Sequence, residues 1–264
     1  MSVVASFALV VAELRRGTKG HLAYPVQAVS ELAGVVFVAA LAAYAPAGFP
    51  GDAGLASGGL GAGARLAGFM MAFVALAGLQ VVHRVVREES DVGTLEQLCL
   101  SPFGLPTIIA ARCLADTVRL APLFLAAVGL AGPLPGLAPR VISAAGAALL
   151  MNAGMLGMGF VIGSLTLVFK RTGFIANLAG IAMLPLALSP LEGLPAAVQR
   201  VASLVPFTHA VRLVRALMTE ATARELLVGA GALCASGAMW LLVGAGVFLV
   251  AERFARARGL LGKY

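Results

Sequence analysis

Long apolar runs alternate with short polar segments along this chain of 264 residues. A helix that crosses a bilayer needs roughly 20 consecutive, mostly apolar residues, and runs of this kind recur along the whole chain. The pattern predicts six spans, at about 23–43, 64–86, 105–130, 141–169, 173–188 and 226–250. The fifth is short and contains Pro185. We therefore expect an all-α integral membrane protein whose single transmembrane domain covers residues 1–264.

Two further segments are amphipathic rather than uniformly apolar. In residues 3–19, apolar side chains recur at helical spacing from Phe7 to Leu14, which favours a helix lying in the inner membrane interface. Residues 190–225 alternate apolar residues with arginines, so they are too polar to span a bilayer and too apolar to form a free loop. We expect short helices there, at the outer interface or dipping into it, directly before the last span.

The composition agrees with a membrane protein. The chain is 60% hydrophobic and 12% charged, with a mean hydropathy of +0.97, whereas soluble domains carry about 25% charged residues. Its 19 Lys and Arg exceed its 12 Asp and Glu, but many basic residues flank the apolar runs. Topology and lipid head groups explain that surplus better than nucleic acid, and both termini are predicted to be cytoplasmic. The cysteines and histidines have no metal-like spacing, so we expect no metal site.

The densest acidic cluster is EESDVGTLEQLCLSP, from Glu88 to Pro102, which lies between the second and third predicted spans and is therefore cytoplasmic. Thr94 and Gln97 fit a capping box, in which the threonine hydroxyl accepts from the amide three residues on. The pattern predicts a short helix at about 94–101, which would expose on one side Leu95, Leu98 and Cys99. Such a helix can dock into a groove of another protein, or it can be a plain capped loop.

The same stretch resembles the hallmark of the permease subunits of type-2 ATP-binding-cassette (ABC) exporters, in particular their drug and antibiotic branch. The resemblance is carried by Arg87-Glu88-Glu89, by Gly93 to Leu98 and by Ser101-Pro102, between the second and third of six spans. The segment from Leu204 to Thr208, before the last span, is also similar to the family pattern.

The resemblance implies a coupling element that docks on a cytoplasmic ATPase and transmits its ATP-driven closure to the membrane helices. The residues of this element would be Glu88, Glu89, Gly93, Thr94, Leu95, Glu96, Gln97, Leu98 and Ser101. Two ATPase copies, which bind ATP and Mg²⁺, and a second permease, identical or homologous, would complete the exporter. The chain has no G-x-x-x-x-G-K-[ST] phosphate loop, so we expect no catalytic residue and no cofactor in it.

By the same resemblance, the chain would lie in the plasma (inner) membrane of a bacterium or archaeon, in contact with lipid. Its substrate would be an amphipathic drug, a lipid or a lipid-linked glycan. The residues leave open an ion-gradient-driven secondary transporter or channel, in which Glu31 or Asp116 would titrate. An intramembrane enzyme ranks last, because no His, Cys or carboxylate constellation converges in the sequence.

Several residues inside the predicted spans are candidates for the substrate path: Gln27, Glu31, Asn152, Met151 and Met155. A carboxylate at membrane depth is costly enough to suggest function, unless Glu31 lies near the interface or pairs with a basic residue. Methionines can adapt to irregular ligands, but the same helical stripe is also typical of core packing.

Two other patterns concern helix contacts. Arg112, Asp116 and Arg119 have the spacing of one helix face, so they can neutralise one another as a structural ion cluster or form a transport site. In the fourth span, small residues would allow close approach of a neighbouring helix or of a second copy of the chain. These residues are Gly154, Gly157, Gly159 and Gly163.

Overall fold

The computed structural model describes residues 11–12, 33, 60–101, 103–119, 137–169, 172–188, 196–218 and 221–259. Every regular element in these ranges is a helix: α3 (Leu60–Val92), α4 (Leu95–Leu100), α5 (Leu105–Arg119), α7 (Leu137–Phe169), α8 (Gly173–Leu188), α9 (Ala196–Ala202), α10 (Pro206–Met218) and α11 (Ala223–Ala257). Apart from residues 11–12 and 33, the predicted interfacial helix and first span lie outside the described residues, and so do Gln27 and Glu31.

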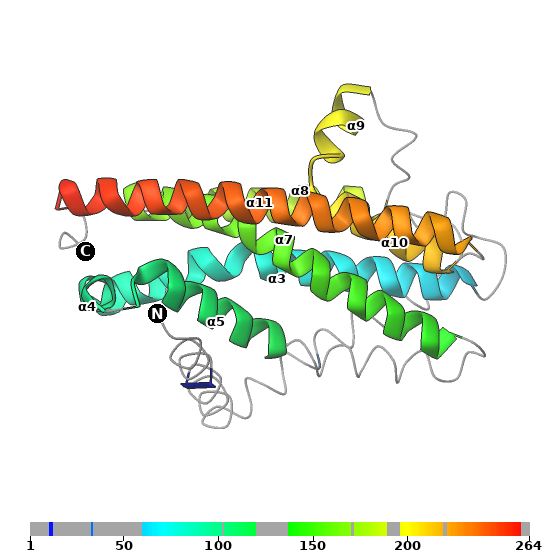
Figure 1. Ribbon diagram of the computed structural model, residues 1–264, viewed down its shortest axis with the longest axis horizontal. Coiled ribbons are helices and arrows are strands. Elements are labelled where there is room, and N and C mark those ends of the chain that lie inside the picture. Colours follow the sequence, from blue (N-terminus) through cyan, green and yellow to red (C-terminus); the bar gives the residue numbers. More distant parts are fainter. Residues whose placement is uncertain are drawn as a thin grey trace.

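Three long helices form the body of the molecule, and α7 packs against both α3 and α11 (Figure 1). Within the described residues, two stretches are long and apolar enough to cross a membrane, Ile142–Phe169 with 28 residues and Ala223–Ala257 with 35. At 1.5 Å per residue, α11 is about 52 Å long, so its ends extend beyond a hydrocarbon core of about 30 Å. The described residues are thus all-helical and compatible with an integral membrane protein, while the full set of six spans stays a prediction.

Glycines bring α7 into backbone contact with its neighbours. A Cβ added to Gly154 would lie 2.8 Å from the Cα of Gly237 in α11, and a Cβ on Gly244 of α11 would overlap the backbone of Gly157. On another face of α7, a Cβ on Gly159 would lie 2.9 Å from the carbonyl oxygen of Gly78 in α3. The partners of the predicted glycine stripe are thus helices of this chain, and the small residues permit the close approach.

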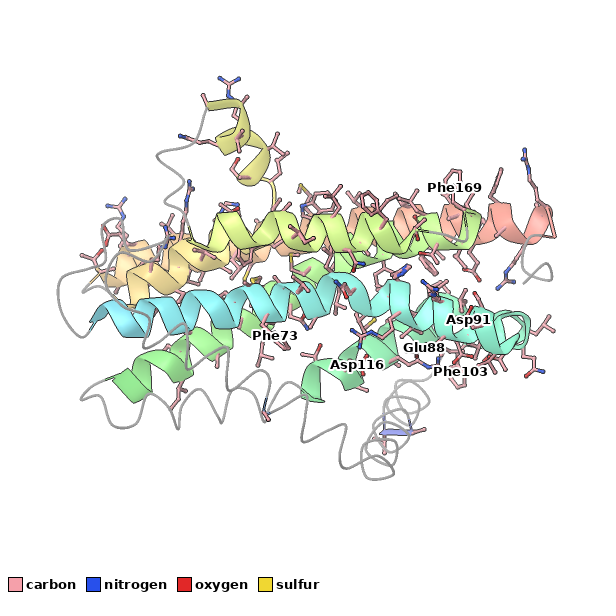
Figure 2. The ribbon with its side chains drawn as sticks, turned by 180° about the vertical axis from the view of Figure 1, so that it is seen from behind. Phe73, Glu88, Asp91, Phe103, Asp116 and Phe169 are labelled. Carbon is pink, nitrogen blue, oxygen red and sulfur yellow. The ribbon has the colours of Figure 1, made fainter. Side chains whose placement is uncertain are left out.

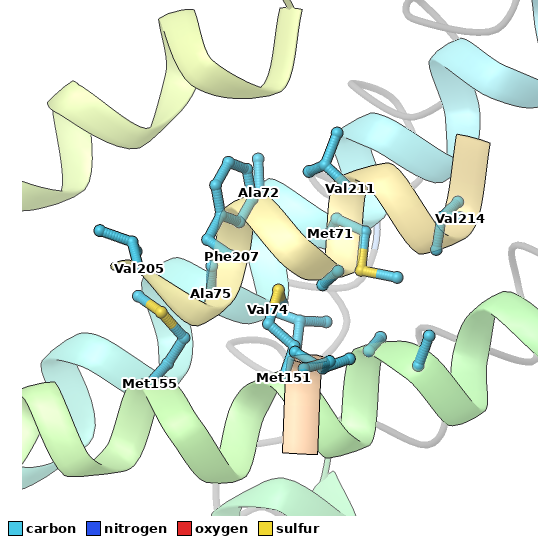
Figure 3. Close-up of a cluster of buried hydrophobic side chains, with 14 of the residues drawn as sticks. Met71, Ala72, Val74, Ala75, Met151, Met155, Val205, Phe207, Val211 and Val214 are labelled. Carbon is cyan, nitrogen blue, oxygen red and sulfur yellow. The ribbon is translucent and has the colours of Figure 1, made fainter. Parts of the chain in front are cut away.

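Two hydrophobic clusters fill the bundle. The first, which we call the α10 core, joins α3, α7, α8, α10 and α11 around residues that include Met71, Leu79, Met155, Phe207 and Leu233. Figure 3 shows Phe207 and Val211 of α10 together with Met71, Val74, Met151 and Met155. The second, the α4 core, joins α3, α5, α7 and α11 around Val82, Val86, Leu105, Leu167 and Phe248.

The observed helix ends differ in part from the predicted spans. The second span was predicted to end at residue 86, but α3 continues to Val92; in this extension Arg87 pairs with Asp91, and Ser90 donates to the Val86 carbonyl. The helix ends where Gly93 takes a positive φ of 77°, a conformation that favours glycine. The last helix is longer than predicted and begins with a capping box between Thr222 and Glu225.

The start of α5 and both ends of α8 agree with the predicted third and fifth spans. The segment predicted as interfacial contains α9 and α10, and α10 packs on the bundle through its buried face. The turn between them is held by α11, because the Leu204 carbonyl accepts from Trp240 Nε1 at 2.7 Å and from Ser236 Oγ at 3.3 Å.

Candidate functional site

The predicted coupling stretch forms a sharp connection at one end of the molecule. Gly93 separates α3 from α4, and Gly104, with a φ of 72°, precedes α5. Figure 2 shows Glu88, Asp91 and Phe103 together at this end, and Figure 1 shows that the C-terminal end of α11 lies there too. A short helix, α4, lies in this stretch between two longer helices that enter the bundle, and its role as a coupling helix stays a prediction.

Glu89 is the hub of this connection. Its side chain is only 9% exposed, and its carboxylate accepts from the Thr94 hydroxyl and from the guanidinium of Arg112 in α5. The Thr94 amide also donates to the Glu89 carbonyl, at 3.0 Å. One buried carboxylate therefore ties together the end of α3, the start of α4 and the middle of α5, through charge-assisted hydrogen bonds.

The predicted capping box does not form. Thr94 has helical backbone angles, φ −89° and ψ −4°, and its side chain makes no capping hydrogen bond to α4. Its hydroxyl donates to Glu89 instead. A bond to a buried carboxylate is stronger than one to a neutral amide, which explains why the tertiary contact replaces the local motif.

The acidic pair of the motif is divided between two environments. Glu88 is exposed, whereas its neighbour Glu89 is buried against Arg112. Consecutive residues of a helix point about 100° apart, so one faces water while the other faces the junction. Only Glu88 of the pair is available to a partner protein at this surface.

The two sides of α4 also differ from the prediction. Leu98 packs against the α4 core instead of being exposed, while Gln97 and Leu100 face outward, Leu100 with 85% of its surface exposed. The side chains of Leu95, Glu96 and Cys99 lie outside the described residues. Ser101 supports the following turn, because its carbonyl accepts from the Gly104 amide at 3.0 Å.

The substrate-path candidates in α7 lie inside this chain's own bundle. Met151 and Met155 are fully buried in the α10 core, the packing role that the sequence also allowed. Asn152 is buried too, and its Nδ2 donates to the Thr117 hydroxyl of α5 at 2.7 Å. Its Oδ1 lies against Gly78 of α3. Asn152 is thus a polar link between α7 and α5, and its place on a substrate path stays a prediction.

Sequence reasoning missed two sets of polar contacts. We expected acidic and basic residues of α5 to neutralise one another. At the junction, however, Arg112 donates to the carboxylate of Glu89 in α3, 23 positions earlier in the sequence. We also assigned no role to His83, whose Nδ1 lies 2.8 Å from the Thr166 hydroxyl. Neither contact leaves a local pattern, because each joins residues that are distant in the sequence.

Comparison with known proteins gives an independent finding. The model of a family described as ABC-2 family transporter protein matches residues 55–245, which include the whole junction around α4. No curated protein matches the chain.

Proposed function

The chain belongs to the ABC-2 family of transporter proteins and is therefore a membrane permease component of an ABC transporter. We propose that it serves an exporter and that α4 receives the motion of a separate ATPase. The family assignment supports a transport subunit rather than an enzyme. The single observation that carries the coupling proposal is that α4 is exposed on one side and anchored in the bundle on the other.

A coupling element must be accessible on one side and fixed on the other. Gln97 and Leu100 supply the accessible side of α4, and exposed Val92 at the end of α3 extends it. Leu98 fixes the other side in the α4 core, where α3, α5, α7 and α11 meet. A displacement imposed on α4 would therefore reach four helices, because closely packed side chains transmit strain.

The positions of the basic residues support an orientation with α4 in the cytoplasm. Arg84 and Arg87 of α3 are exposed and lie toward the same end as the last turns of α11. Those turns carry three more exposed arginines, Arg253, Arg256 and Arg258. Basic residues concentrate on the cytoplasmic side of membrane proteins. The C-terminus of α11 would then be cytoplasmic, as the sequence predicts for both termini.

The complete exporter in this proposal contains two permeases, identical or homologous, and two ATPase subunits that bind ATP and Mg²⁺. Its membrane would be the plasma membrane of a bacterium or archaeon. The apolar composition supports an amphipathic drug, a lipid or a lipid-linked glycan as substrate. Gentle purification from the native membrane, followed by mass analysis, should yield an ATPase with a phosphate loop at one copy per permease subunit.

The docking surface can be tested by placing a charge on it. Leu100→Asp should abolish association with that ATPase, because the residue is exposed on the outward side of α4. Ala257→Asp, at an exposed position on the same end of the molecule, is the matched control and should retain association. Both variants should unfold at the temperature of the parent chain. Normal ATPase association in Leu100→Asp would contradict the assignment of α4.

A further inference from the structure

The turn between α9 and α10, residues 203–205, lies deep along α11 rather than at its end, and we call it the deep turn. The Leu204 carbonyl in it accepts from Ser236 Oγ at 3.3 Å and from Trp240 Nε1 at 2.7 Å. Ser236 lies ten residues, or about 15 Å, after the start of the apolar stretch 226–250 of α11, and 14 residues, or about 21 Å, before its end. The deep turn is therefore near the middle of the membrane depth that α11 crosses.

The contacts of α10 agree with this depth. A Cβ on Gly154, in the middle of α7, would lie 2.8 Å from Cγ of Pro206, the first residue of α10. A Cβ on Gly229 of α11 would lie 3.3 Å from Cδ1 of Leu213, further along α10. Helix α10 thus runs antiparallel to α11, from the deep turn toward the N-terminal end of α11.

Arg200 is brought to the same depth by the last turn of α9. Ser203 Oγ donates to the Arg200 carbonyl at 2.7 Å, so the deep turn follows α9 directly. Arg200 precedes Leu204 by four residues, which rise about 6 Å in a helix. Residue 200 therefore stays within the apolar depth of α11 in any direction of α9. Its side chain is exposed and has no ion pair in the part of the chain that the structure describes.

The surroundings of Arg200 are apolar and accessible. Helix α9 projects from the bundle of long helices (Figure 1), and Ala202 is its one buried residue. Val201 and Leu204 have 66% and 55% of their surface exposed. The last turn of α9 therefore presents a single cation next to exposed apolar side chains. An amphiphile with an anionic head group and a hydrocarbon chain has the complementary chemistry.

Neither lipid solvation nor topology accounts for this cation. A charged side chain facing lipid at membrane depth is costly, and such residues typically mark a substrate path. Basic residues also concentrate on the cytoplasmic side of membrane proteins. Residues 196–218 lead away from that side in the proposed orientation, yet they contain three basic residues, Arg200, Arg212 and Arg215, and no acidic one. An anionic ligand would compensate the charge that the described residues leave unpaired at residue 200.

We propose that the last turn of α9 binds the anionic head group of an amphiphile, with Arg200 as the cation and with Val201 and Leu204 beside the hydrocarbon chain. A guanidinium can donate two parallel hydrogen bonds to a phosphate or a carboxylate, which makes arginine suited to such head groups. The role of the ligand rests on the proposed function: in an exporter, this ligand is the substrate. The substrate class then narrows to amphiphiles that carry an anionic group.

Binding can be measured by native mass spectrometry of the purified full-length chain in dodecyl maltoside micelles. The two probes are n-dodecyl phosphate and n-dodecylphosphocholine, which share the chain and the phosphate but differ in net charge. The parent chain should bind n-dodecyl phosphate about tenfold more tightly, because only this probe leaves a net negative charge for the guanidinium. Equal affinity for the two probes would overturn the proposal.

Variants decide whether Arg200 is responsible. Arg200→Gln should bind n-dodecyl phosphate about tenfold more weakly than the parent, because it loses a charge-assisted hydrogen bond. Arg200→Lys keeps the charge and should lose less affinity than Arg200→Gln. Arg224→Gln removes the same charge from an exposed position just before the apolar stretch of α11 and should bind as the parent does. Unchanged affinity in Arg200→Gln, or an equal loss in Arg224→Gln, would contradict a site at α9.

ATP hydrolysis by the chain together with its co-purified ATPase separates a substrate from a resident lipid. Addition of n-dodecyl phosphate should stimulate hydrolysis with the parent chain and with Arg224→Gln, but not with Arg200→Gln. Binding to the parent without stimulation would assign a resident lipid and refute the substrate class. The binding measurement needs no ATPase, so absence of an ATPase partner would contradict the proposed function and leave the binding result intact.

Discussion

Replacing Glu89 with glutamine should destabilise the junction of α3, α4 and α5 far more than the same change at Glu88. The side chains of Glu89 and Arg112 are only 9% and 11% exposed. Removing one partner of a buried ion pair costs about 3–5 kcal/mol, because the other charge stays buried after losing that partner. Glu88, one position earlier, is exposed. Glu88→Gln is therefore a surface substitution and should change the free energy of unfolding by no more than about 0.5 kcal/mol.

The interaction free energy between Glu89 and Arg112 can be measured with a double-mutant cycle of Glu89→Gln and Arg112→Met. Each single variant leaves a buried charge, whereas the double variant leaves none. The cost of the double variant should therefore be smaller than the sum of the single costs, by about 2 kcal/mol. The free energy of unfolding can be followed by fluorescence in mixed detergent micelles, because the chain contains one tryptophan, Trp240.

Hydrogen exchange gives a second readout of the same change. Loss of the Glu89 carboxylate also removes the acceptor of the Thr94 hydroxyl, so the amides of α4 should exchange faster in Glu89→Gln than in Glu88→Gln. Single costs that add within about 0.5 kcal/mol, or equal effects at Glu88 and Glu89, would refute the assignment of Glu89 as the hub.

Two further predictions concern helix packing. Gly244→Val should destabilise the fold by about 3 kcal/mol or more, because its Cβ would overlap the backbone of Gly157, whereas Gly246→Val should be tolerated because a Cβ there meets nothing within 4 Å. Thermal unfolding of both variants checks this, and equal stability would contradict the backbone contact. Trp240→Phe should cost about 0.5–1.5 kcal/mol, because the Leu204 carbonyl loses the donor at 2.7 Å and keeps only Ser236 Oγ. Denaturation followed by circular dichroism checks this, and an unchanged stability would show that the bond contributes nothing.

The existence of the helices could be predicted, because apolar runs of this length are typical of spans and their flanking residues mark the ends. The fifth run shows this clearly: Lys170 and Arg171 precede it and Pro190 follows it, and α8 has the predicted bounds, Gly173–Leu188. The end of α3 could not be predicted in the same way. Hydropathy reports the match of a segment to a bilayer, whereas the backbone stays helical until a residue such as Gly93 breaks it.

The contacts of the coupling stretch needed the tertiary structure. The spacing of Thr94 and Gln97 is compatible with a capping box, but the same hydroxyl can serve a buried carboxylate when the fold brings one close. Which of Glu88 and Glu89 is buried depends on the direction in which α3 presents them to α5. The sequence therefore predicted a short helix at this place, while the contacts of its individual residues depend on the packing of Arg112 and Leu98.

A displacement of α4, as the coupling proposal requires, would have a continuous route to the other end of the bundle. In the α4 core, Leu98 of α4 packs against a cluster that includes Phe160 of α7. Met155, which lies between one and two turns earlier in α7, belongs to the α10 core. Between the cores, α7 and α11 meet at Gly157 and Gly244 with backbone against backbone. Helices in such close contact cannot slide past each other without a clash, so α7 and α11 should move as one body. Because α10 packs on that body through its buried face, we expect it to follow a displacement of α4 rather than to move independently.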